Sequence, residues 1–122
     1  MGSMRNAPVF NDGVFDLFAI EQREIAKDAK GDVLVDKHMK ICYREVSVFD
    51  RLRFEFDQGG KEVTLKIQIP QYREIDSHCM LKINGEWHKV FNAAHTFDKQ
   101  GYPVTELTLI KPEAMYPVLE EL

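Results

Sequence analysis

Residues 79–92 read CMLKINGEWHKVFN and carry the pattern that decides the fold. Two runs of strand-forming residues flank Asn84-Gly85, and Asn-Gly is the strongest two-residue signal for a β-hairpin. A two-residue turn fixes the register of the two arms, so that Leu81 faces His88 across the hairpin. The stretch therefore predicts two antiparallel strands joined by a tight turn.

Outward from this hairpin, the chain shows further short strand patterns. In residues 63–69, VTLKIQI, apolar and polar side chains alternate, as they do in a strand with one buried face. The other expected strands are residues 14–20, 38–48 and 104–110, while residues 49–60 fit both a strand and a short helix. The sum predicts a mainly β protein: a small antiparallel β-barrel or sandwich of five or six strands, with at most one short helix and long loops.

The expected organisation is an expression scar at residues 1–3, a single β-rich domain at residues 4–110 and a C-terminal tail at residues 111–122. Within the domain, residues 21–36 are charged and have little apolar periodicity, so they are expected to form a long loop. Residues 95–102 are expected to form a second loop.

Composition excludes some classes of function. The chain of 122 residues is 44% hydrophobic and 30% charged, which is ordinary for a soluble globular protein. Its net charge is −4, and no cluster of lysine and arginine forms a stripe, which argues against a protein that grips nucleic acid by its phosphates. No signal-peptide pattern is visible in it, and no stretch approaches the roughly 20 apolar residues that a membrane helix needs. These features favour a cytosolic protein.

Three of the four histidines and Cys79 lie between residues 78 and 95, which raises the question of a metal or catalytic site. Their spacing contains no HxH, helical HxxxH or CxxC pattern, the arrangements by which one rigid element presents two ligands. Cys79 lies among apolar residues and is expected to be buried. His38 and Cys42 are four residues apart on one expected strand, and this pair is an equally weak indication of a metal site. We therefore expect no catalytic, cofactor-binding or metal-binding residues and no enzymatic activity.

Residues 46–110, which include the hairpin, resemble the small head–tail connector proteins of tailed bacteriophages and prophages of Gram-positive bacteria. These are also called head-closure, stopper or adaptor proteins. The resemblance lies in VSVFDRLRFEFDQGGKEVTLKIQIPQYREID (46–76) and KINGEWHKVFNAAHTFDKQGYPVTELTLI (82–110). The shared order includes a strand ending in Ile-Pro, a tight turn with an aromatic residue two positions after its glycine, and a closing strand of alternating Leu and Thr. It covers about half of the chain.

The resemblance implies a non-enzymatic virion protein, made in the host cytoplasm, that joins the head to the tail. Such proteins assemble as a ring on the portal or its adaptor and contact a tail protein, while DNA passes through without sequence-specific binding. A long loop helps to retain the packaged genome. The candidate here is residues 21–36, with Lys30, Gly31 and Asp32 at its centre, and the chain ends would contact neighbouring subunits.

The tail adds an argument from its own residues. It carries Met115, Tyr116, Val118 and Leu119 with no strand or helix of its own to bury them. Apolar groups at that density usually find a partner surface, so these four residues are expected to make contacts. Packing of the tail on its own barrel is the other interpretation.

An alternative function is a free-standing small barrel that binds a ligand, sugar or nucleic acid. Trp87, Phe91 and Tyr102 could form a stacking platform for a base or a sugar. An aromatic core under the barrel is the simpler interpretation of the same residues.

Overall fold

The computed structural model describes residues 8–46 and 63–121, and nearly all of their regular structure is β-strand. The ambiguous segment 49–60 lies outside the described residues. The strands are β1 (Gly13–Ala26), β2 (Ala29–Glu45), β3 (Val63–Pro70), β4 (Cys79–Ile83), β5 (Glu86–Phe97) and β6 (Pro103–Ile110). A single 3-10 turn, η1 (Leu119–Glu121), is the helical element of the described part. The prediction of a mainly β fold is confirmed, with six strands.

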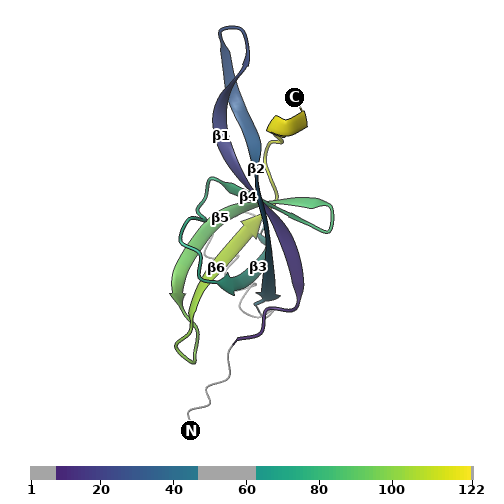
Figure 1. The fold of residues 1–122 in the computed structure, drawn as a ribbon. Helices are drawn as coiled ribbons and strands as arrows, with labels where there is room; N and C mark the ends of the chain where they lie inside the picture. The colour runs from purple at the N-terminus through teal and green to yellow at the C-terminus, as the bar shows by residue number, and fades with distance from the viewer. Residues whose placement is uncertain (1–7, 47–62, 122) are drawn as a thin grey trace.

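The six strands form one antiparallel sheet that closes on itself in the order β1-β2-β3-β6-β5-β4 (Figure 1). Pairing of β1 with β4, from Asp16↔Lys82 to Ala19↔Cys79, completes the ring. β2 and β3 are joined through Arg44↔Gln68 and Glu45↔Ile67. Closure pairs the outer strands with each other and so covers most of the hydrogen-bonding edges that an open sheet would expose.

The interior of the ring holds the main hydrophobic core, contributed by alternate residues of each strand. The Phe15 and Tyr43 rings lie 6.2 Å apart between β1 and β2. The full set of buried core residues is Phe15, Leu17, Tyr43, Ile67, Ile69, Ile75, Cys79, Leu81, Ile83, Val90, Leu107 and Leu109. On β2, Met39 and Ile41 pack against this core beside Tyr43.

The β4–β5 hairpin confirms the register expected from Asn84-Gly85. Leu81 pairs with His88, and Ile83 pairs with Glu86 across the turn. Both turn residues have positive φ, 52° at Asn84 and 82° at Gly85, as a type I′ turn requires. The expected loop over residues 95–102 is wrong at its start, because β5 continues to Phe97 and pairs with β6 over that length.

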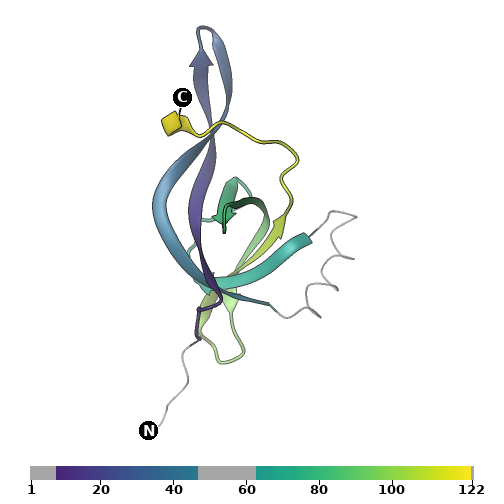
Figure 2. The same ribbon diagram turned by 90° about the vertical axis from the view of Figure 1, so that its right-hand side faces the viewer.

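The expected long loop over residues 21–36 is wrong. These residues form the distal arms of β1 and β2, paired from Ile20↔Leu34 to Ala26↔Ala29 and joined at Lys27 and Asp28. Asp28 adopts a positive φ of 60° in the turn. The hairpin projects beyond the barrel at the end away from the start of β1 in both views (Figures 1 and 2).

Candidate interaction surfaces

The projecting part of the β1–β2 hairpin is a ribbon of two strands. β4 pairs with β1 only as far as Ala19, so residues 21–26 of β1 pair with residues 29–33 of β2 and with no other strand of the described chain. Residues 22–30 are exposed on both faces of the ribbon. An isolated two-stranded ribbon is marginally stable in water, and its outer edge is open to another chain. This ribbon is therefore the most prominent candidate interaction surface.

The side chains of the ribbon are mixed in charge. Residues 21–32 include three basic and four acidic residues, a net charge of −1. Lys30 and Asp32 are exposed, and Arg23 donates a 2.6 Å hydrogen bond to Glu21 that lowers the pKa of that carboxyl. Gly31 leaves room for the side chain of Ile25, since a Cβ there would lie 2.9 Å from the Ile25 Cδ1. Such a surface lacks the excess of basic residues that a firm grip on phosphates requires.

The C-terminal tail packs against the base of this hairpin. It runs from the end of β6 to the hairpin base (Figure 2). The Leu34 amide donates a 2.8 Å hydrogen bond to the Pro117 carbonyl, and Val118 forms a parallel bridge with Leu34. The tail thus pairs with one edge of β2 where the ribbon leaves the barrel.

A second hydrophobic cluster, here called the outer cluster, lies under the tail on the outside of the barrel. Its buried residues are Phe18, Leu34 and Met80, and the partly buried residues packed against them are Ile20, Trp87, Tyr116 and Val118. Tyr116 and Val118 therefore pack on the barrel of their own chain, which is the second of the two interpretations of the tail. Leu119 is half-buried, and Met115 remains 55% exposed. Contacts of the tail with another molecule remain a prediction, for which Met115 is the most accessible residue.

The three aromatic residues of the alternative function do not form one platform. Trp87 packs edge-on against Phe18 with ring centroids 4.7 Å apart, and the Lys82 ammonium lies 5.3 Å from its ring. Phe91 lines a pocket of about 420 Å³ with Tyr116, while Tyr102 lies beyond the far end of β5. Because Trp87 and Tyr102 flank opposite ends of a 12-residue strand, they cannot stack on neighbouring bases.

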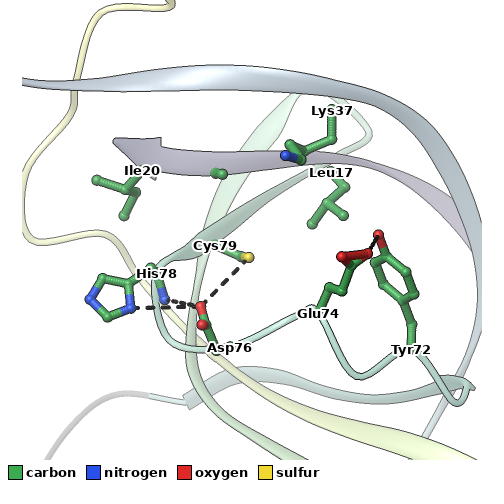
Figure 3. A pocket seen from close by; sticks show the side chains of 9 residues that line it. Leu17, Ile20, Lys37, Tyr72, Glu74, Asp76, His78 and Cys79 are labelled. Carbon is green, nitrogen blue, oxygen red and sulfur yellow. Dashed lines mark hydrogen bonds and ion pairs between the residues drawn. The ribbon is translucent and has the colours of Figure 1, made fainter. Parts of the chain in front are cut away.

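The adjacent His78 and Cys79 line a pocket of about 250 Å³ beside β1 (Figure 3). Asp76 organises its rim, because one carboxylate oxygen accepts the His78 amide at 2.8 Å and lies 3.9 Å from the Cys79 sulfur. On the other side, the Tyr72 hydroxyl donates a 2.7 Å hydrogen bond to Glu74. Burial raises the pKa of the Cys79 thiol, and the hydrogen bond to Glu74 raises the pKa of Tyr72. Neither group is activated as a nucleophile or a base.

The remaining histidines of the 78–95 stretch are held by threonines. The His88 Nδ1 lies 2.9 Å from the Thr64 hydroxyl, and the His95 Nδ1 lies 2.8 Å from the Thr105 hydroxyl. Burial lowers the pKa of His88, with the charge of Glu86 opposing that shift. His78 precedes β4, whereas His88 and His95 both lie on β5 but contact different threonines, so the three histidines form no ligand group among the described residues. His38, by contrast, lies beside Asp36 and Glu120, a grouping that the spacing of the sequence does not indicate.

Comparison with protein families and with curated proteins identifies no relative of this chain. No protein-family model matches the chain, and no curated protein matches it either. Among the described residues, no helix is long and apolar enough to span a membrane.

Proposed function

We propose that this protein is a structural component of a tailed-phage or prophage virion that joins the head to the tail. It acts as a ring of subunits on the portal or its adaptor, with a tail protein on the opposite face and the DNA channel through the centre. It is made in the host cytoplasm and ends in the virion, and it has no catalytic role. The resemblance of residues 46–110 to head–tail connector proteins supports this proposal.

The observation that carries the proposal is the projecting ribbon at residues 21–32. A small barrel has no need of a two-stranded extension with both faces in water, because such a ribbon adds little stability to the isolated subunit. In a ring, the same ribbon gains neighbours on both sides. Residues Lys30, Gly31 and Asp32 then meet either the next subunit or the DNA channel.

Charge supports a conduit that DNA passes without sequence-specific binding. The net charge of the chain is −4, and the ribbon itself is close to neutral. Arginine and lysine contacts to phosphates dominate the affinity of proteins for DNA, so a basic ribbon would hold the genome in place. A ribbon of mixed charge at the channel would let DNA pass without holding it.

The first experiment removes the protein from a phage or prophage that encodes it. We expect heads and finished tails to accumulate unjoined, with packaged DNA lost from the heads, as seen by electron microscopy of lysates. Complementation with the intact gene should restore joined particles. Normal joining in the deletion strain would contradict the proposal.

The second experiment shortens the ribbon without disturbing the barrel. Arg23 pairs with Gly31, so replacing residues 24–30 by Asn-Gly leaves a two-residue turn between paired positions. We expect a folded subunit that fails to complement the deletion. The matched control is Asp28→Asn, which keeps the length and the positive-φ turn residue and should complement fully. Full complementation by the shortened protein would show that the ribbon has no role in assembly.

A further inference from the structure

Three metal-ligating side chains from distant parts of the chain meet at the base of the projecting hairpin. Asp36 and His38 belong to β2, and Glu120 belongs to η1 at the end of the tail. One ligand atom from each of the three lies within 4.8 Å of the other two. The His38 Nε2 lies 3.2 Å from a Glu120 carboxylate oxygen.

The backbone of β2 directs His38 to this position. The β1–β2 pairing steps from Asp16↔Lys40 to Phe18↔Asp36, so β2 bulges with extra residues opposite Leu17. His38 has a positive φ of 56° in this bulge, and its amide donates a 2.7 Å hydrogen bond to the Asp36 Oδ1. Bulges of this kind change the direction in which a side chain points. The second Asp36 oxygen, Oδ2, lies 3.8 Å from the His38 Nδ1 and is available to a cation.

The tail supplies the third group through contacts that are independent of the cluster. The hydrogen bond from Leu34 to Pro117 and the bridge from Leu34 to Val118 hold the chain just before Glu120. The cluster is therefore assembled by the packing of the tail, and its ligands approach from two segments. The arrangement therefore differs from a run of acidic residues that are neighbours in the sequence.

We propose that Asp36, His38 and Glu120 bind a divalent transition-metal ion of the Zn²⁺ class and thereby fasten the tail to β2. One imidazole and two carboxylates form a mixed N/O set, which such ions accept, whereas Mg²⁺ and Ca²⁺ prefer oxygen alone. Two tetrahedral ligands at about 2.0 Å from zinc are about 3.3 Å apart, close to the observed Nε2–oxygen separation of 3.2 Å.

The site is open on its outer side. The side chains of His38 and Glu120 are 73% and 51% exposed, whereas that of Asp36 is 29% exposed. Exposed side chains rotate freely, which allows the remaining ligand distances to shorten around an ion. The remaining coordination positions are open to water.

The test measures Zn²⁺ binding to the full 122-residue chain, carrying no affinity tag, by isothermal titration calorimetry. His38→Ala and Glu120→Gln should each weaken binding by about tenfold or more, because the first removes a ligand and the second removes the negative charge of one. The matched control is His78→Ala. His78 stands two residues after Asp76, with its Nδ1 3.7 Å from the carboxylate, but among the described residues this pair belongs to no group of three ligands.

A second measurement follows the tail directly. We expect Zn²⁺ to slow hydrogen exchange at the Leu34 amide, whose partner is the Pro117 carbonyl, and to have no such effect in Glu120→Gln. Circular dichroism of each variant verifies that the barrel is folded. Stoichiometric binding that depends on His38 and Glu120 supports the proposal. Three results would overturn it: no heat of binding, binding that survives His38→Ala, and binding lost in a Cys42→Ser variant, which alters the exposed thiol of β2.

Discussion

Replacing Val118 by aspartate tests whether the tail is part of the folded subunit. Val118 is partly buried against the outer cluster and bridges Leu34 on β2. A carboxylate at this position would lie among Phe18, Leu34 and Met80, all of which are buried, so it should expel the tail. The variant should therefore behave as a barrel with an undocked tail.

The loss of stability is limited to the free energy of tail docking. Half-burial of Tyr116 and Val118 contributes about 1 kcal/mol each, from the 1.5–3 kcal/mol typical of full burial. The hydrogen bond from Leu34 to Pro117 adds about 1 kcal/mol. Ordering the tail offsets part of this sum, although Pro117 restricts the undocked chain and reduces that cost. The net loss should be about 1–2 kcal/mol, or a fall in Tm of about 4–8 °C.

Trp87 makes the assay specific, because it is the only tryptophan of the chain and packs against the same cluster. Thermal unfolding by circular dichroism gives the change in Tm. The fluorescence of the native state should shift to longer wavelength as Trp87 gains solvent. Met115→Asp is the control, since Met115 is 55% exposed and should tolerate the charge. If Val118→Asp and Met115→Asp leave Tm and emission equally unchanged, the docked tail is refuted.

Three further predictions follow from single contacts. Gly13→Ala should lower the free energy of unfolding in urea by about 1–3 kcal/mol, because the new Cβ would overlap the buried Tyr43 ring. Gly85→Ala is the control without a steric clash, because a Cβ there meets no atom within 4 Å; its own destabilisation comes from the positive φ of the turn. Cys79 should resist iodoacetamide in the native state while the exposed Cys42 reacts, as mass spectrometry would show; equal labelling would contradict the buried thiol. The pKa of His88 is lowered by burial, so the unfolded state binds a proton first and stability should fall as the pH drops below about 6.5. His88→Gln should have a shallower decline of Tm between pH 7.5 and 5.5, and an unchanged slope would remove His88 from this effect.

The sequence predicted those elements whose signal is local. Asn84-Gly85 determines a turn type, and the turn determines the register, so the pairing of Leu81 with His88 follows without further information. Strands with one buried face show the period of two that the interior imposes, as in residues 63–69. The inward direction of Ile67 and Ile69 was predictable for the same reason.

The projecting ribbon was not predictable in this way, because neither of its faces is buried. Hydrophobic periodicity arises where one face of a strand is buried, and residues 22–30 are exposed on both faces. Their turn, Lys27-Asp28, also lacks the glycine that identifies the turn at Asn84-Gly85. The cluster of Asp36, His38 and Glu120 was missed for a related reason: tertiary packing alone brings its parts together.

The outer cluster changes where the contacts of an assembly should be sought. Phe18 and Met80 point out of the barrel, and the exposed apolar surface that they would present is covered by Tyr116 and Val118 of the same chain. The buried parts of those tail residues become available to a neighbouring subunit only if the tail leaves this cluster, which would uncover it again. A contact increases the total buried surface only if it uses residues that are exposed in the isolated subunit. The ribbon of residues 21–32 provides such residues together with an unpaired strand edge, so ring contacts are expected there before they are expected at the tail.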